Sequence, residues 1–417
     1  MRESCLIIGG GASGLAAAAY LSSCGVPALL LERQNRVGKK ILSTGNGRCN
    51  LSNLSMSPDR YGKAENFVRQ VCSVTPPGDV LGLLARLGLL LSEEEGRIYP
   101  RTKMAATVLD VLRAPLESGT VCVETDVRVT DLSLSHGLWR AVSEDRRAFT
   151  APFVLFCPGG SAGPKFGTDG SAMSIVQKLG HTLVPVVPAL VQLRCRHTAL
   201  PSLKGLRAHA GVSLLIDGSP AGQETGELLF TDYGVSGIPV MQLSGLASRA
   251  LLEKRDVSLT IDLLPEQPAQ DAALFLQNRI SELHPADLAR LFTGVLPRML
   301  ARALLKECGF SPESPPEELT NETLLRLARV LHAFPFPVTG TMGFDHAQVT
   351  SGGVALSEVS PQTMESRLCR GLFFAGEVLD VDGPCGGYNL HFAFSSAMTA
   401  ARAIAEHASR SRKDEHV

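Results

Sequence analysis

The sequence has 417 residues, in which 40 Lys and Arg nearly balance 41 Asp and Glu, and it contains 10 Cys. The length allows two or three domains with a substantial buried core, and the charge balance argues against nucleic acid or an anionic membrane as the main partner. The cysteines lack a C-x-x-C pair or zinc-like spacing, so we expect free thiols in a reducing cytoplasm and no metal site.

The first thirty-three residues predict the start of a dinucleotide-binding unit. An apolar strand (Cys5–Ile8) precedes a G-x-G-x-x-G turn (Gly9–Gly14) and an Ala-rich helix (Leu15–Cys24), and a second apolar run (Ala28–Leu31) ends at Glu32. Such a turn presents backbone N–H groups at a helix N-terminus to phosphates, and the acid accepts hydrogen bonds from a ribose. The order of these elements therefore indicates dinucleotide binding.

Two other interpretations of this region are weaker. The uncharged run from Ser4 to Leu31 is long enough to span a membrane, but Ser22, Ser23, Gly25 and Pro27 interrupt it. A signal peptide would need a basic start, and its cleavage would remove the glycine turn. We expect an unprocessed, soluble, cytoplasmic protein with no membrane partner.

The next segments favour FAD over a nicotinamide cofactor. A dehydrogenase with a single G-x-G-x-x-G unit continues as alternating strands and helices. Here a loop of small and polar residues (Gly38–Asn53) follows, and then strand-like segments at Val121–Glu124, Val127–Leu134 and Leu138–Val142. In the loop, Lys39, Lys40 and Arg48 can offset diphosphate charge, while Thr44, Asn46 and Asn50 can hydrogen-bond a ribityl chain or ring edge.

The middle of the chain contains a strand-rich segment followed by a segment of predicted helices. Ala151–Cys157 reads as one continuous strand that runs into Gly159-Gly160, a second place where backbone could approach a nucleotide. Residues 191–264 are strand-rich. Helices are then predicted at Ala272–Leu283, Ala286–Leu305 and Thr320–Ala333, the last capped by Thr320.

The C-terminal part returns to dinucleotide-like chemistry. An apolar strand (Leu372–Ala375), an Asp- and Gly-rich loop and a helix (Tyr388–Ala405) follow one another. The predicted organisation is a FAD-binding domain in two parts, residues 1–190 and 336–417, with an inserted β-rich domain (191–264) and an inserted helical domain (265–335).

Four motifs together resemble one flavoprotein family. They are Gly9–Gly14, Lys39–Asn53, Thr339–Gly353 and Phe374–Leu390, and the resemblance covers essentially the whole chain. The family comprises NAD(P)/FAD-dependent oxidoreductases of the aminoacetone-oxidase-like type, which includes bacterial reductases of unsaturated bile-acid intermediates. It implies non-covalent FAD and an α/β fold: a Rossmann-like two-dinucleotide-binding FAD domain, an inserted β-barrel-like domain and a small helical domain.

The glycine turn and the resemblance together nominate the residues that contact FAD. They are Gly9, Gly11, Ser13, Gly14, Glu32, Arg33, Lys40, Thr44, Gly45, Arg48, Cys49, Asn50, Val127 (by its backbone, near the adenine), Gly159 and, near the ring, Gly376, Glu377, Gly387, Tyr388, Asn389 and Leu390. One departure concerns Pro158, which stands in Phe156-Cys157-Pro158 where the family has Ala-Thr-Gly. Proline lacks a backbone N–H, so a contact expected there is in doubt.

Three functions follow as hypotheses. The leading one is a reductase of an unsaturated or carbonyl-conjugated small molecule, with NAD(P)H as a transient electron donor and Tyr388, Tyr233, Cys385 or His391 as proton donor. The second is an oxidase of small amines that uses oxygen. The third is a protein whose FAD is structural and whose inserted domains engage RNA or protein. Cys49 and Cys385 also suggest a redox disulfide, if they approach each other.

Overall fold

The computed structural model describes residues 3–414. Its backbone contacts divide the chain into two compact units. The discontinuous unit holds the described residues up to Val186 and from Gln348 onward, and the inserted unit is Val187–Ala347. None of the described helices is both long and apolar enough to cross a membrane.

A five-stranded parallel sheet forms the centre of the discontinuous unit. Its strands are β1 (Cys5–Ile8), β2 (Ala28–Leu31), β6 (Val121–Glu124), β10 (Phe153–Phe156) and β19 (Leu372–Phe374), in the order β19-β10-β1-β2-β6. All four pairings are parallel. A parallel sheet is covered on both faces, which explains why β1, β2, β10 and β19 are continuous apolar runs rather than alternating ones. The edge strand β6 is exposed beyond Val121.

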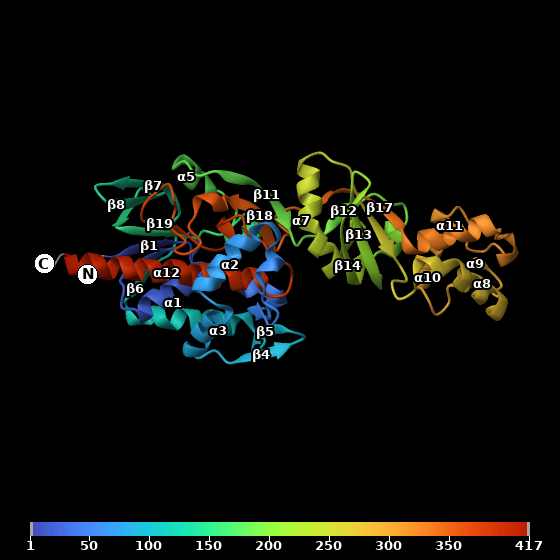
Figure 1. The fold of residues 1–417 in the computed structure, drawn as a ribbon, viewed down its shortest axis with the longest axis horizontal. Coiled ribbons are helices and arrows are strands. Elements are labelled where there is room, and N and C mark those ends of the chain that lie inside the picture. The colour runs from blue at the N-terminus through green and yellow to red at the C-terminus, as the bar shows by residue number, and fades with distance from the viewer. Residues whose placement is uncertain (1–2, 415–417) are drawn as a thin grey trace. The chain divides into compact units, whose positions relative to one another are not determined.

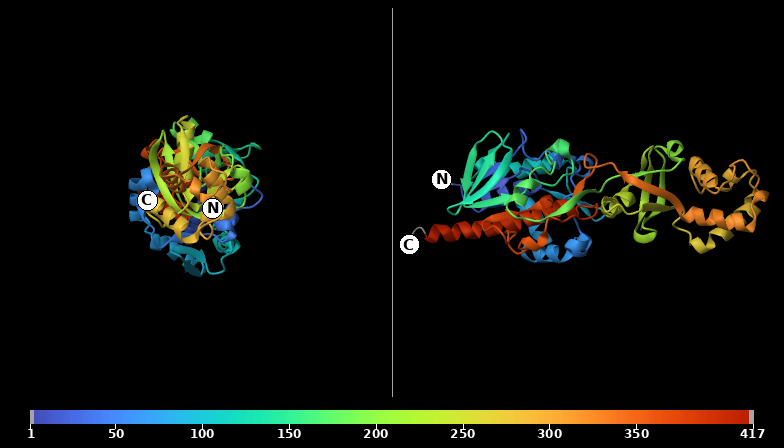
Figure 2. Two further views of the ribbon diagram at one scale, coloured as in Figure 1. Left: turned by 90° about the vertical axis from the view of Figure 1, so that its right-hand side faces the viewer. Right: turned by 90° about the horizontal axis from the view of Figure 1, so that it is seen from above.

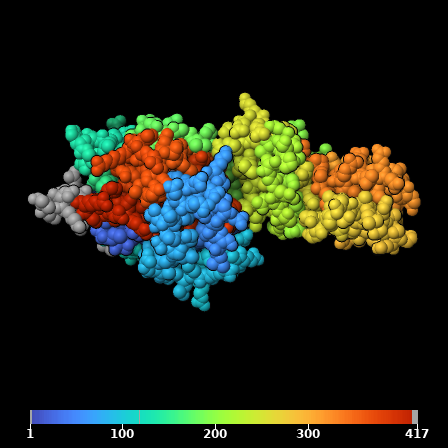
Figure 3. Space-filling model, viewed as in Figure 1, coloured from blue at the N-terminus to red at the C-terminus, as the bar shows by residue number. Residues whose placement is uncertain are grey.

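Two helices from opposite ends of the chain pack together beside this sheet (Figure 1). They are α1 (Ala12–Ser23) and α12 (Tyr388–Asp414), and Ala16–Ala19 of α1 are completely buried. Alanines let the helix backbones approach closely, so the Ala-rich pattern reflects this contact. The helix α2 (Glu65–Val74) packs on α12 from the solvent side (Figure 3).

Smaller elements complete the discontinuous unit. Two three-stranded antiparallel sheets are β3 (Ser52–Asn53), β5 (Arg97–Pro100) and β4 (Leu91–Glu94), and β7 (Val129–Ser135), β8 (Leu138–Ser143) and β9 (Ala148–Ala151). A two-stranded sheet pairs β11 (Leu183–Ala189), which leads into the inserted unit, with β18 (Val349–Val354). The remaining helices are α3 (Pro77–Arg86), α4 (Ala105–Arg113) and α5 (Met173–Lys178), with 3-10 turns η1 (Ile41–Gly47), η2 (Pro58–Ala64), η3 (Ala114–Ser118), η4 (Pro164–Phe166), η7 (Leu356–Glu358) and η8 (Gly376–Val378).

The inserted unit is a closed six-stranded barrel with helices (Figure 2). The barrel strands are, in spatial order, β12 (Leu193–Cys195), β15 (Gly234–Gly237), β14 (Ser219–Phe230), β13 (Arg207–Ile216), β16 (Val257–Asp262) and β17 (Phe334–Thr341). The helices are α6 (Leu200–Leu203), α7 (Ile238–Leu252), α8 (Ala272–Leu283), α9 (Leu288–Leu291), α10 (Arg298–Glu307) and α11 (Asn321–His332), with 3-10 turns η5 (Ala269–Asp271) and η6 (Pro316–Glu318).

Barrel and helices share one hydrophobic core. The strand β17 completes the barrel by pairing with both β12 and β16, which removes the exposed edges that an open sheet would leave. Residues 336–347 therefore group with the inserted unit by their contacts. The four domain boundaries derived from the sequence stay predictions about functional domains.

Two predicted elements are divided by proline, and one predicted helix cap is confirmed. The strand expected over Ala151–Cys157 is two strands, β9 and β10, that meet at Pro152, because proline cannot donate to a sheet ladder. The helix expected over Ala286–Leu305 is α9 and α10, since Pro297 starts α10 and ends any continuous helix before it. In α11, Thr320 caps the helix as predicted by accepting a hydrogen bond from the Thr323 N–H.

Candidate functional site

Five predicted cofactor residues from distant segments lie at one edge of the parallel sheet. Gly9 follows β1, Glu32 follows β2, Val127 follows β6, Gly159 follows β10 and Gly376 follows β19. All five lie at the carboxyl ends of their strands. Because β2 lies on one side of β1 and β10 on the other, the strand order reverses there, which is where open α/β sheets bind ligands.

The glycine turn has the shape that a diphosphate requires. Gly9 has a φ of +106°, and a Cβ on it would lie 2.5 Å from the carbonyl oxygen of Cys157. A Cβ on Gly14 would lie 1.9 Å from the Gly9 oxygen, so helix and strand pack closely here. A Cβ on Gly11 would meet nothing within 4 Å, so the N-terminus of α1 opens onto free space. The turn therefore fits a dinucleotide phosphate.

Glu32 is held in place at the end of β2 by backbone groups. Its two carboxylate oxygens accept hydrogen bonds from the N–H groups of Gly10 and Gln34, both at 2.7 Å. Burial raises the pKa of Glu32, against the effect of these hydrogen bonds. The N–H of Val127 donates to the Glu32 carbonyl at 2.9 Å. Glu32 thus joins the ends of β1, β2 and β6, and its carboxylate retains lone pairs for a ribose.

Three predicted cations are already paired with carboxylates. Arg33 binds Asp169 at 2.7 Å and Lys40 binds Glu377 at 2.6 Å. Arg48 binds Glu94 at 2.7 Å and lies 4.5 Å above the ring of Tyr99. The hydrogen bonds from Arg48 and Lys103 lower the pKa of Glu94 to about 2. The charge that these cations offer to a diphosphate is therefore largely balanced in the protein itself.

Glu377 connects three segments around the edge of the sheet. One of its carboxylate oxygens accepts from the Lys40 ammonium, and the other accepts from the backbone N–H (2.9 Å) and hydroxyl (2.8 Å) of Thr350. The Thr350 hydroxyl oxygen in turn accepts from the N–H groups of Ser161 and Ala162, at 2.7 and 2.9 Å. This network fixes the loop after β10 against β18 and η8.

The N-terminus of α12 is clamped to the loop that follows η1. With its amide oriented to satisfy both ends, Asn50 accepts from the Gly387 N–H at 3.1 Å and donates to the Ser52 carbonyl at 3.0 Å. Gly387 has a φ of +98°, and a Cβ on it would lie 2.4 Å from the Ser52 oxygen. Asn389 closes the preceding loop through two hydrogen bonds with the backbone of Gly383. The amide dipole of this terminus therefore has a fixed direction.

Two of the four candidate proton donors lie together at this terminus. The hydroxyl of Tyr388 donates to the Ser55 carbonyl at 3.3 Å, and its ring meets that of Tyr61 edge to face. The imidazole Nδ1 of His391 lies 3.0 Å from the Ser52 hydroxyl. Burial lowers the pKa of His391 to about 4, so the imidazole is neutral at pH 7.

The other two candidates have different settings. Tyr233 lies in the inserted unit, in the turn before β15, where its carbonyl accepts from the Cys195 N–H. Cys385 is half-buried in the loop before α12, and Cys49 is completely buried with its thiol pKa raised by burial to about 11. Neither of these two cysteines forms a disulfide bond.

The remaining predicted contacts line the same region. Gly376 has a φ of +74°, and a Cβ on it would lie 2.2 Å from the Ser13 hydroxyl oxygen. Thr44 donates its hydroxyl to the Ile41 carbonyl within η1, and Gly45 has a φ of +54°. Leu390 is half-buried in the first turn of α12.

Sequence reasoning missed three residues that contact predicted site residues and hold them in position. Ser52, Tyr61 and Thr350 contact His391, Tyr388 and Glu377, respectively. Thr350 and Ser52 had a detectable signal, because they belong to the Thr339–Gly353 and Lys39–Asn53 motifs, whereas Tyr61 lies outside every motif. Ser52 and Tyr61 are more than three hundred residues from their partners, so the sequence does not reveal these contacts.

Comparison with known proteins adds a family and three relatives. The model of the HI0933-like protein Rossmann domain family matches residues 3–403. A 3-dehydro-bile acid delta(4,6)-reductase of Clostridium scindens is 39% identical, over 96% of this chain and 98% of the relative. Ribosomal RNA dihydrouridine synthases of Haemophilus influenzae and Escherichia coli are 28% and 29% identical, with the same coverage of both chains.

Proposed function

Because the chain belongs to the HI0933-like family and is an FAD-dependent oxidoreductase, we propose that it reduces an unsaturated or carbonyl-conjugated small molecule. Hydride comes from the reduced flavin, and NAD(P)H is the electron donor. The observation that carries this proposal is the 39% identity, over nearly the full length of both chains, to a reductase named for a keto-conjugated steroid acid. The proposed substrate class is therefore an enone of steroid size.

The proposal assigns each part of FAD to a part of the discontinuous unit. The open space at Gly11 and the N-terminus of α1 would hold the diphosphate. Glu32 would bind the adenosine ribose, and Gly387–Leu390 would hold the ring. When bound, FAD supplies the hydride chemistry, and the protein supplies position and electrostatics.

The N-terminus of α12 stabilises negative charge on the reduced ring. Its free N–H groups and its dipole favour an anion, and the Asn50 clamp keeps Gly387 in place. The side-chain amide of Asn389 is already hydrogen-bonded to the backbone of Gly383. Its part in the site is therefore to hold the loop in which Cys385 lies.

His391 is assigned a positioning role and Tyr388 the proton transfer. The buried imidazole of His391 is neutral at pH 7, so it carries one ring proton and not the second proton of an imidazolium. Its Nδ1 holds the Ser52 hydroxyl in place. The Tyr388 hydroxyl makes a long hydrogen bond of 3.3 Å and can exchange it for a bond to substrate. Phenylalanine at position 388 should lower kcat at least tenfold while FAD is retained.

A second candidate function is modification of ribosomal RNA, which the names of two relatives favour. RNA binding needs a basic surface that neutralises phosphates. The inserted unit instead has 17 Asp and Glu against 14 Lys and Arg, a net charge of −3. This balance favours the small-molecule substrate.

Anaerobic mixing tests the proposal. NADPH or NADH should bleach the FAD absorbance of the purified protein, and a 3-keto-4-ene steroid should restore it. Bleaching only by an amine would instead support the oxidase. Restoration by ribosomal RNA and not by the steroid would support the second candidate, and a flavin that neither nicotinamide reduces would overturn the proposal.

A further inference from the structure

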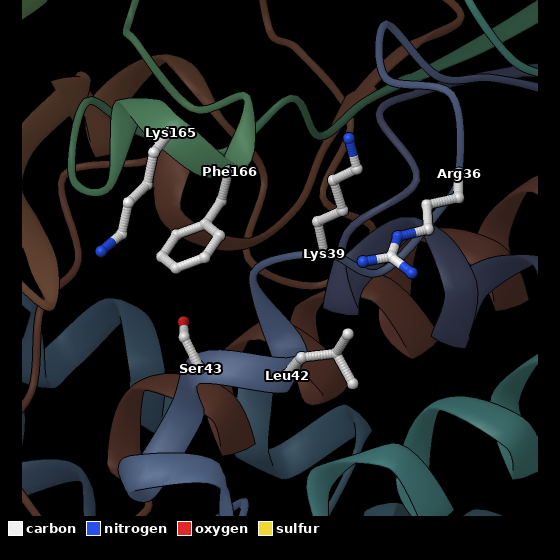
Figure 4. Close-up of a pocket in the computed structure, with 6 residues that line it drawn as sticks. All are labelled: Arg36, Lys39, Leu42, Ser43, Lys165 and Phe166. Carbon is white, nitrogen blue, oxygen red and sulfur yellow. The ribbon is translucent and has the colours of Figure 1, made fainter.

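A cationic hollow of about 420 Å³ lies on the discontinuous unit, beside the proposed FAD path. It is lined by Arg36, Lys39, Leu42, Ser43, Lys165 and Phe166. Residues 36–43 form one wall and residues 165–166 of η4 form the other (Figure 4). Three of the six lining side chains are cations, and none is acidic.

The cations of this hollow differ from the cations of neighbouring segments in their partners. Arg33, Lys40 and Arg48, which lie in neighbouring segments, each form an ion pair with a carboxylate. Among the described side chains, by contrast, no carboxylate pairs with any of the three cations in the hollow. Lys39 donates to the Gln34 amide oxygen at 2.6 Å, and the Lys165 ammonium lies 5.1 Å from the centre of the Phe166 ring.

The chemistry of the lining matches a phosphate monoester attached to an aromatic base. Arg36 and Lys39 come from one wall of the hollow and Lys165 from the other (Figure 4), and both an Arg fork and an ammonium group suit a dianionic phosphate. The Ser43 hydroxyl adds a donor. The half-buried ring of Phe166 offers an apolar face for stacking. Arg36 and Lys165 are exposed, so a ligand can enter and leave, as a transiently bound donor must.

The hollow is separate from the glycine turn but adjacent to it. No residue of Gly9–Gly14 lines it, and neither does Glu32. The Gly38 N–H donates to the Gly10 carbonyl at 2.8 Å, which places the wall beside the turn. Ser43 then leads directly into Thr44–Asn50, the segment expected to hydrogen-bond the ribityl chain or ring edge of FAD. A nucleotide held here would lie alongside FAD rather than in its place.

We propose that this hollow binds the 2′-phosphate of NADPH and so makes the protein prefer NADPH over NADH. The inference rests on the proposed function, because it names the donor of that reductase. Its ligand is the phosphate monoester of a dinucleotide, and the diphosphate of FAD, which is an anionic diester, is the competing ligand. The experiments below distinguish the two.

Direct binding is measured first, by calorimetry on the FAD-loaded protein. NADP+ should bind at least tenfold more tightly than NAD+, which lacks the 2′-phosphate, with a difference that shrinks as salt is raised. Arg36→Gln and Lys165→Gln should each weaken NADP+ binding about tenfold and leave NAD+ binding unchanged. Lys178→Gln is the matched control, since Lys178 is an exposed cation of the same unit outside the hollow. Equal binding of the two nucleotides would overturn the proposal.

Measurements of flavin reduction and of FAD affinity distinguish a failure of this inference from a failure of the proposed function. In the same two variants, the NADPH concentration for half-maximal reduction should rise about tenfold, while that for NADH and the affinity for FAD stay unchanged. A loss of FAD affinity would assign the hollow to the FAD diphosphate and overturn the proposal. Equal use of both donors, unaffected by the variants, would overturn it while leaving the proposed reductase intact. Reduction by neither donor would mean that the proposed function itself has failed.

Discussion

Gly11 and Gly14 lie three residues apart in the same turn, yet each must be glycine for a different physical reason. The space beside Gly14 is filled by the Gly9 oxygen, whereas the space beside Gly11 is open. One glycine is therefore needed for the fold, and the other for what the fold binds.

Alanine substitutions should separate these two demands. Gly14→Ala should lower the free energy of unfolding by about 3 kcal/mol, because the new methyl collides with backbone. Gly11→Ala should cost no more than about 1 kcal/mol, the usual penalty of Ala at an N-cap, but should weaken FAD at least tenfold. Denaturant unfolding of the FAD-free protein and fluorescence titration with FAD measure the two effects. Gly78→Ala, in the open first turn of α3, is the control; if Gly11→Ala binds FAD normally, the assignment of the turn is wrong.

His391 should make stability depend on pH over a defined window. Its pKa is lowered from 6.5 to about 4 by burial, so the unfolded chain takes up a proton before the folded protein does. Stability from the neutral imidazole is therefore complete above about pH 6.5 and is lost as the pH falls from there to about 4, by about 3 kcal/mol.

Asparagine at position 391 keeps a group that can hydrogen-bond Ser52 and removes the titration. Urea unfolding of the FAD-free wild type and of His391→Asn, at intervals from pH 4 to pH 8, should show a shallower slope for the variant below pH 6.5. Parallel curves over this range would mean that His391 is not buried in its neutral form.

The reactivity of individual cysteine thiols should follow how deeply each side chain is buried. The exposed Cys24 and Cys122 should react with a disulfide reagent within minutes, whereas Cys49 should react only on unfolding, because it is fully buried and its thiol pKa is raised to about 11. Mass spectrometry of the labelled protein, with and without FAD, gives the order. Fast labelling of Cys49 would revive the redox pair with Cys385.

At the scale of elements, Thr350 on β18 supports the loop that follows β10. Thr350→Val keeps the shape of the side chain but leaves the N–H groups of Ser161 and Ala162 without an acceptor in a buried place. The expected loss is about 3 kcal/mol of unfolding free energy, together with weaker FAD binding as the loop at Gly159 loosens. Thr350→Ser retains the hydroxyl and should behave as wild type in both measurements. A valine variant of unchanged stability would show that the network contributes nothing.

Elements were predictable from sequence where the determining pattern is local. The strands β1, β2 and β6 and the helix α8 have the expected bounds, because period, glycine turns and caps act within a few residues. The splits at Pro152 and Pro297 show the opposite case, in which one proline outweighs an apolar run.

Long-range pairing was not predictable, because the partner lies elsewhere in the chain. Lys40 was expected to face a diphosphate, but it binds Glu377, 337 residues away. The same holds for Ser52 and His391. The residues that sequence patterns nominate for FAD do come together at one edge of the sheet, while the hydrogen bonds that hold this edge depend on tertiary packing.

At the scale of the whole molecule, every predicted FAD contact lies in the discontinuous unit. Tyr233 is the one candidate of the site that the inserted unit contributes. The inserted unit also has its own closed barrel and its own core. Each unit therefore has its own core and its own set of candidate site residues. A deletion of the inserted unit can test what each one does.

The connection between the units makes such a deletion feasible. The Ala355 N–H donates to the Thr182 carbonyl, and Gly352 lies against Pro185, so β11 and β18 pair in antiparallel fashion. In this register Val186 lies opposite Ser351, three residues beyond Gln348, so the two ends to be joined are a short distance apart along the ladder. A four-residue Gly-rich turn can join them, as in a hairpin.

A chain in which this turn replaces residues 187–347 should fold and bind FAD within about threefold of the wild-type affinity, because the glycine turn, Glu32 and the start of α12 are all present. NADPH should still bleach its flavin, since the cationic hollow is also retained, but reduction of a 3-keto-4-ene steroid should fall at least a hundredfold as the inserted unit is lost. Absorbance of the bound flavin, titration with FAD and anaerobic turnover measure the three quantities. A folded deletion variant, judged by circular dichroism, that cannot retain FAD would show that the inserted unit holds part of the cofactor. Undiminished steroid reduction would place the whole substrate site on the discontinuous unit.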